Sequence, residues 1–271
     1  RFAKIPLLEP GDSQEAKDMA AAAFDLSEQF DTPVLVRMTT RVAHSSSVVE
    51  LGERLEHGRR VKQFPRNMQK YVTLPAIARQ LHVIQEERMK KLADFVETFA
   101  FNRIEMGSPE LGIVSCGVAY QYAREVFPDA SFLKLGMSYP LPRAMVADFA
   151  RQVKRLIAIE EGDPFLEEGI RLIGIPAEGK SIFPLCGELS VQVVRDSAIA
   201  AWLLPKSERV KRVAVETGQL PQIGGQSFRC FRLAMNQKGA RRPALHGVRP
   251  GQQFMMIGVT AEALQHLDAR P

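Results

Sequence analysis

Apolar positions recur at helical spacing in the first thirty residues of the chain. Asp12 and Glu15 have the spacing of a helix N-cap and the acidic residue that bonds back to it. Behind them, apolar side chains return every three or four positions as far as Phe30. The residue before Pro33 avoids the helical region, so the helix is expected to end there. Residues 34–36 are apolar and predict a short buried strand.

Between residues 108 and 203, short apolar runs alternate with segments of helical period. The predicted strands are residues 111–115, 131–135 and 156–159, and the predicted helices are residues 119–127, 141–153, 164–172 and 190–203. Strands that alternate with helices in this way favour a parallel sheet with helices on both faces. The predicted fold class is therefore α/β.

The rest of the chain is less regular. Residues 53–107 begin as a polar, basic stretch and continue, from Pro75, as a long amphipathic helix that is expected to pack across the junction between two domains. We expect the last helix and strand of one domain in residues 1–52 and a complete α/β domain in residues 108–203. Residues 204–271 have little periodicity, apart from a possible strand and short helix after Phe254, and predict an irregular tail.

Composition narrows the class of protein. The chain has 271 residues, 45% hydrophobic and 25% charged, with no apolar run near the roughly 20 residues of a membrane helix. The net charge of +5 comes from basic clusters without interleaved aromatic residues, which argues against nucleic acid. Three scattered cysteines without metal-ligand spacing argue against a disulfide framework and a metal site. These features predict a cytoplasmic protein. The first residue is Arg1, not Met, so we expect a piece of a larger chain.

The polar residues after the first strand are the first candidates for chemistry. Thr39, Thr40, Arg41 and His44 follow residues 34–36, and strand ends in parallel sheets commonly face a ligand or an interface. An Arg can hold a carboxylate through a bidentate pair, and a His can donate to a phosphate or carbonyl. Arg41 and His44 are therefore the candidate substrate or interface residues. The simpler interpretation, that they are ordinary surface groups, is favoured.

Two other groups follow predicted strands. Glu160 and Glu161, with Asp163, could act in acid–base chemistry or hold a cation, but acids also favour the first turn of a helix, here the one from Pro164, and we prefer that role. Cys116 has no basic neighbour in sequence and is interpreted as a small buried apolar residue. Gly117 is expected to allow a tight turn into the next helix, because no phosphate-binding glycine motif is present.

Several segments together resemble a known family. They are residues 5–18, 31–44, 49–52, 133–136, 139–140, 160–168, 179–184 and 187–190. These segments, taken in order, cover about residues 1–200. They are similar to the 2-oxoacid:ferredoxin oxidoreductases, and most closely to the alpha subunits of the indolepyruvate-oxidising group.

The resemblance implies a function for the whole enzyme. Such an enzyme decarboxylates arylpyruvates oxidatively with thiamine diphosphate and Mg²⁺, forms the acyl-CoA from CoA, and passes electrons through 4Fe-4S clusters to ferredoxin. It implies a partial pyrimidine-binding domain in residues 1–52 and a transketolase-C-terminal-like domain in residues 108–203. A beta subunit is the implied partner, and an oligomer is expected.

The sequence departs from the family pattern at the cofactor sites. The Gly-Asp-Gly motif that holds Mg²⁺ and diphosphate is absent, as are the cluster cysteines, and the activating Glu would precede Arg1. We therefore expect no cofactor bound by this chain alone and no complete active site; a truncated or frameshifted reading frame is one hypothesis for the loss. Two alternatives stay open: a non-catalytic scaffold that docks a partner subunit or ferredoxin, and a CoA- or nucleotide-binding domain that uses the strand ends after Ser115 and Leu135.

Overall fold

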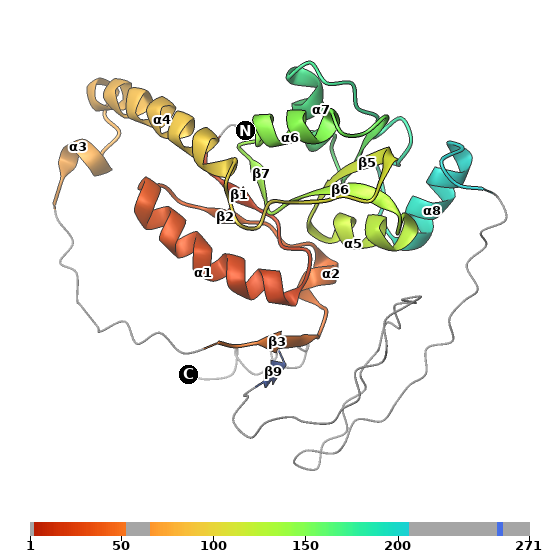
Figure 1. Ribbon diagram of the computed structural model, residues 1–271. Helices are drawn as coiled ribbons and strands as arrows, with labels where there is room; N and C mark the ends of the chain where they lie inside the picture. The colour runs from red at the N-terminus through yellow and green to blue at the C-terminus, as the bar shows by residue number, and fades with distance from the viewer. Residues whose placement is uncertain (1–2, 53–65, 206–253, 257–271) are drawn as a thin grey trace, which may run out of the picture.

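The computed structural model describes residues 3–52, 66–205 and 254–256 (Figure 1). Its centre is a four-stranded sheet in the order β4-β6-β5-β8. The strands are β4 (Arg103–Glu105), β5 (Ser108–Cys116), β6 (Ala130–Leu135) and β8 (Leu156–Ile159). β5 runs parallel to both β6 and β8, and β4 pairs antiparallel with β6 at the edge. The parallel α/β sheet that the sequence predicts is confirmed.

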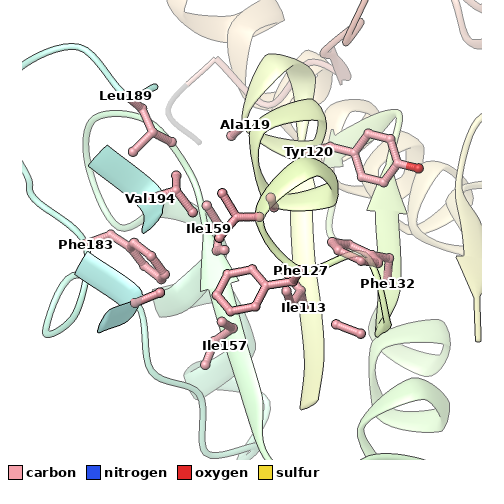
Figure 2. Close-up of a cluster of buried hydrophobic side chains, with 14 residues drawn as sticks. Ile113, Ala119, Tyr120, Phe127, Phe132, Ile157, Ile159, Phe183, Leu189 and Val194 are labelled. Atoms are coloured by element: carbon pink, nitrogen blue, oxygen red, sulfur yellow. The ribbon is translucent and has the colours of Figure 1, made fainter. Parts of the chain in front are cut away.

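Helices cover both faces of this sheet because successive strand residues point to opposite sides. α5 (Gly117–Val126) and α8 (Val191–Ala200) lie on one face, whereas α6 (Arg143–Ala150) and α7 (Phe165–Leu172) lie on the other (Figure 1). On the α5 side, Ile113, Phe132 and Ile157 from three strands form one core (Figure 2). Their neighbours Val114, Leu133 and Ala158 belong to the core on the opposite face. Apolar residues on both faces explain why these strand segments are largely apolar and do not alternate with exposed polar residues.

A second sheet joins the N-terminal segment to the central domain. β1 (Leu7–Leu8) pairs in parallel with β2 (Leu35–Val36) and antiparallel with β7 (Met137–Tyr139), which follows β6 directly. α1 (Ser13–Phe30) connects β1 to β2 and begins as predicted, with the Asp12 carboxylate accepting from the Glu15 N–H at 2.8 Å. Residues 137–139 thus contribute to the sheet that residues 1–52 begin.

The long helix is present but only partly packed. α4 (Pro75–Val96) follows the short α3 (Met68–Tyr71), and its buried residues, Leu92 and Val96, lie at its C-terminal end. There it packs against α1 and β1. Ile84, expected on the apolar side, is 49% exposed. A helical pattern shows which side is apolar but not how far the neighbouring element reaches, and the apolar side of α4 is buried only toward its C-terminal end.

Short elements complete the described structure. α2 (Thr40–Ala43) follows β2, and β3 (Val48–Glu50) pairs antiparallel with β9 (Phe254–Met256). The strand expected from Phe254 is therefore present, while residues 206–253 and 257–271 of the predicted tail lie outside the described residues. Residues 103–105, expected to belong with the long helix, form the edge strand β4 of the central sheet.

Candidate functional site

The central sheet reverses its winding between β5 and β8. From β5 the chain passes through α5 to β6 on one side, and from β6 it later passes through α6 to β8 on the other side of β5. In open parallel sheets, ligands bind at the carboxyl ends of the strands at such a switch point. The residues at this position are Cys116, the last residue of β5, Gly117 after it, and Glu160 and Glu161 after β8.

A small cavity lies between this switch point and the N-terminal segment. Its walls come from the ends of β1, β2 and β8 and from the start of α5, and consist of Glu9, Pro10, Arg37, Thr39, Cys116, Gly117, Val118, Ala119 and Glu161. The cavity volume of about 10 Å³ is close to the space that one water molecule needs. The cavity in this form is too small for a coenzyme.

The turn from β5 into α5 depends on a glycine. Gly117 has φ 54°, in the left-handed region that residues with a Cβ rarely adopt. Gly11 lies against this turn, because a Cβ built on it would be 2.8 Å from the Gly117 carbonyl oxygen. The role predicted for Gly117, a tight turn into a helix, is confirmed.

The wall nearest the N-terminal segment carries a partly buried charge pair. Glu9 has only 5% of its side chain exposed and pairs with Arg37. Burial, followed by the nearby carboxylate of Glu9, raises the pKa of the Cys116 thiol well above its ordinary value. Cys116 is 4% exposed and belongs to a hydrophobic core, so its interpretation as a buried apolar residue is confirmed. The hydroxyl oxygen of Thr39 is buried in the same wall without a hydrogen-bond partner.

The two predicted site residues lie beside this cavity and not in its wall. Arg41 is in α2 and forms an exposed ion pair with Glu188, 147 residues away, in the loop before α8. The hydrogen bond that Arg41 donates to the Glu188 carboxylate raises the pKa of the Arg41 guanidinium. His44 is exposed at the end of α2, where its backbone N–H donates to the Thr40 carbonyl at 2.9 Å. Arg41 therefore links the N-terminal segment to the central domain.

The acids after β8 bind backbone groups. The Glu160 carboxylate accepts from the N–H groups of Leu166 at 2.7 Å and Glu167 at 3.0 Å, which begin α7. Burial raises the pKa of Glu160 despite these bonds. Glu161 accepts from the Leu189 N–H at 2.9 Å. For Glu160, the preferred interpretation, an acid at the start of a helix, is confirmed.

Two negative findings apply to the described residues only. Over residues 3–52, 66–205 and 254–256, no three His, Cys, Asp or Glu side chains are grouped as a metal site would require. Within the same ranges, no helix has both the length and the apolar character to cross a membrane.

The sequence does not indicate the Glu9–Arg37 pair or the Arg41–Glu188 pair. Each joins residues that the fold brings together, and nothing in their local sequence indicates the partner. Arg37 and Thr39 do follow a predicted strand at its carboxyl end, which is the one signal that points to this position.

The chain matches several known proteins in sequence. It is 38% identical over 179 residues to the indolepyruvate oxidoreductase subunit IorA of Archaeoglobus fulgidus, an alignment that covers 65% of this chain and 29% of the relative. The IorA subunit of Methanothermobacter marburgensis is 33% identical over 237 residues, which cover 82% of this chain and 37% of the relative. No protein-family model matches the chain.

One solved structure has a similar fold. It is a 2-oxoglutarate:ferredoxin oxidoreductase from Magnetococcus marinus with 2-oxoglutarate, coenzyme A and succinyl-CoA bound. The TM-score is 0.50 at 15% sequence identity, over 72% of this chain and 42% of that chain, so the likeness concerns the fold alone. The sequence matches bear out the predicted resemblance: the chain is similar to the IorA subunits of indolepyruvate oxidoreductase and spans about a third of their length.

Proposed function

We propose that the chain is the part of an indolepyruvate:ferredoxin oxidoreductase subunit that joins a cofactor-binding domain to a transketolase-like domain. The observation that carries the proposal is the 38% identity to an IorA subunit over 179 residues. The reaction of the whole enzyme would be the oxidative decarboxylation of arylpyruvates to acyl-CoA, with electrons passed to ferredoxin. A beta subunit would be the partner and the cytoplasm the compartment.

The residues of this chain do not fit a thiamine diphosphate and Mg²⁺ site. The Gly-Asp-Gly motif is absent from the sequence, and the described residues offer no grouped metal ligands. The cavity at the switch point has room for about one water molecule. We therefore assign no catalytic step to this chain, and the cofactor would be held by other residues of the enzyme.

The proposed role of this part is structural. Contacts between the N-terminal segment and the central domain include the shared sheet of β1 and β7, the buried Glu15–Lys134 ion pair and the exposed Arg41–Glu188 ion pair. A scaffold of this kind would fix the distance between the two ligand-binding parts of the subunit. Arg41 and His44, exposed on and beside α2, are proposed as contacts with the partner subunit.

A chimeric enzyme tests the proposal. In the A. fulgidus subunit, the 179 matched residues are replaced by those of this chain, and the product is co-expressed with the other subunit of that enzyme. We expect indolepyruvate- and CoA-dependent reduction of ferredoxin. An assembled chimera that binds thiamine diphosphate but is inactive would refute the proposed role. Calorimetry on the isolated chain should show no saturable binding of thiamine diphosphate.

A further inference from the structure

One face of α4 points away from the rest of the molecule. In Figure 1, α4 runs outward from the central domain, with α3 beside its outer end. Leu92, which is fully buried, follows Val83 by nine residues, or about two and a half helical turns, and so lies on the opposite side of the helix. The outward face is exposed along its whole length and consists of Ala76, Arg79, Gln80, Val83, Glu87 and Lys90.

The centre of this face is apolar, and opposite charges lie on either side of the centre. Val83 is 59% exposed and the neighbouring Ile84 is 49% exposed. Arg79 lies four residues before Val83, and Glu87 lies four residues after it. At 1.5 Å per residue these two side chains begin about 12 Å apart along the helix axis, too far to pair within one helix. Within the described residues, neither forms an ion pair or a side-chain hydrogen bond.

A second copy of α4, running antiparallel to the first, would satisfy both charges. A two-fold axis at Val83 brings the residue four positions before the axis level with the residue four positions after it in the other copy. Arg79 of each copy would then face Glu87 of the other, which makes two ion pairs across one seam. By the same symmetry Ala76 would lie level with Lys90, and its small side chain leaves room for the lysine stem.

The other ways to cover this face fit the charges less well. A parallel pair of α4 helices would place Arg79 level with Arg79 and Glu87 level with Glu87, so that like charges meet. A helix of another sequence would gain nothing from charges placed evenly about Val83, whereas a surface that binds its own copy requires that symmetry. The arrangement of the charges therefore favours a second copy, in the antiparallel sense.

We propose that the outward face of α4 binds the same face of a second copy of this chain, as an antiparallel helix pair centred on Val83. A single helix pair buries less than the about 1,200 Å² of a stable interface, so the expected dissociation constant is on the order of tens of micromolar. The ion pairs lie at the solvent-exposed margin of the seam, so added salt should weaken the dimer. The pairing concerns the chain itself and does not rest on the proposed function.

Sedimentation equilibrium on the whole chain tests the inference through an exchange of charges. At low salt, the unaltered chain should dimerise between about 1 and about 300 μM. Arg79→Glu and Glu87→Arg, made singly, should each raise the dissociation constant by about tenfold or more, because each places like charges together at two points of the seam. The two substitutions combined should restore the dissociation constant to within about threefold, since the pairs form again with their signs exchanged. Arg143→Glu, at an exposed residue of α6, is the matched control and should dimerise as the unaltered chain does.

A substituted cysteine at the centre of the seam supplies a second measurement. A residue on the two-fold axis meets its own copy, so Val83→Cys should give, on mild oxidation, a disulfide that joins the two substituted positions, as mapped by mass spectrometry. Arg143→Cys is the control and should give no such link. A chain that stays monomeric, a dimer that none of the charge variants weakens, or a double variant as weak as the single ones would overturn the inference. Equal cross-linking of Val83→Cys and Arg143→Cys would overturn it as well.

Discussion

The buried ion pair between α1 and β6 gives the sharpest test of how the N-terminal segment is held. Lys134 is fully buried, and its Nζ lies 2.6 Å from the carboxylate of Glu15, whose side chain is 13% exposed. Glu15 also accepts from the Gly11 N–H at 2.8 Å and pairs with Arg103 at 3.0 Å. Within the described residues, Glu15 is the only ion-pair partner of Lys134. The two single substitutions are therefore expected to differ.

The larger cost falls on Glu15→Gln, which leaves a buried ammonium without its counter-charge. Removing one partner of a buried pair typically costs about 3–5 kcal/mol. Deprotonation of Lys134 sets an upper limit to this cost. The pKa of lysine in the unfolded chain is about 10.4, so releasing its proton in an assay at about pH 7.4, about three units lower, costs about 4 kcal/mol. We expect a loss of about 3–4 kcal/mol in the free energy of unfolding.

Lys134→Met should cost far less. Burial lowers the pKa of Lys134 even beside Glu15, so the folded protein bears a desolvation cost that Met removes. The Glu15 carboxylate keeps Arg103 and the Gly11 N–H, and the expected loss is about 1 kcal/mol or less. Glu15→Gln combined with Lys134→Met should be close to Lys134→Met alone, because no unpaired charge remains.

Urea unfolding followed by far-UV circular dichroism measures these differences. Lys154→Met is the control, since Lys154 and Glu110 pair at 2.6 Å with 70% and 66% of their side chains exposed. An exposed pair of this kind should contribute less than about 1 kcal/mol. A Lys134→Met variant less stable than Glu15→Gln would refute the reasoning.

The pH dependence of the same variants gives a second criterion. The expected cost of Glu15→Gln falls by about 1.4 kcal/mol per unit as the pH rises above about 7.4, because Lys134 loses its proton more easily. Burial opposes the charged form of Glu15, but Lys134 and the neighbouring hydrogen bonds lower its pKa overall. The stability that ionised Glu15 contributes is complete above the pKa of Glu in the unfolded chain, about 4.3. It is lost as the pH falls through the lower pKa that Glu15 has in the folded chain. A cost that stays constant from neutral to alkaline pH would contradict this account.

Three further predictions concern the switch point. Gly117→Ala should lower the free energy of unfolding by about 1–2 kcal/mol, measured by urea titration, because φ is 54° there. Cys186, which is exposed, should react with iodoacetamide at pH 8 within minutes, whereas the buried Cys116, whose pKa is raised, should remain unmodified by mass spectrometry in the folded chain; equal labelling would contradict its burial. Arg41→Ala should leave the urea midpoint unchanged, since its pair with Glu188 is exposed, yet weaken co-purification of the partner subunit with the chimera; unchanged co-purification would remove Arg41 from the proposed interface.

The central sheet could be predicted because its signals are local. The predicted strand at 156–159 coincides with β8, and the one at 131–135 lies within β6 and begins one residue after it. The one at 111–115 lies within β5, which begins three residues earlier. Each run is long enough to distinguish a buried strand from its polar surroundings.

The second sheet could not be predicted in the same way. The strand predicted at residues 34–36 is present as β2, but β1 has only two residues, too few for a period, and it pairs with β7 about 130 positions later in the chain. Such pairing depends on the packing of α1 against the central domain, which leaves no mark in the local pattern. The same holds for Glu9 with Arg37: both side chains are visible in the sequence, but their contact is a product of the fold.

The N-terminal segment has two sides that differ in their contacts, and substitutions on the two sides should have different effects. On one side, Glu15 and β1 bind the central domain through a buried pair and a shared sheet. On the other side, Phe24 and the edge of β2 contact no described element that would cover them. Substitutions on the first side should therefore reduce the stability of the isolated chain, whereas substitutions on the second side should leave it intact and affect assembly alone. A Phe24→Glu chain that unfolds at lower urea than the unaltered chain would show that this side already contributes to the core, and the division would fail.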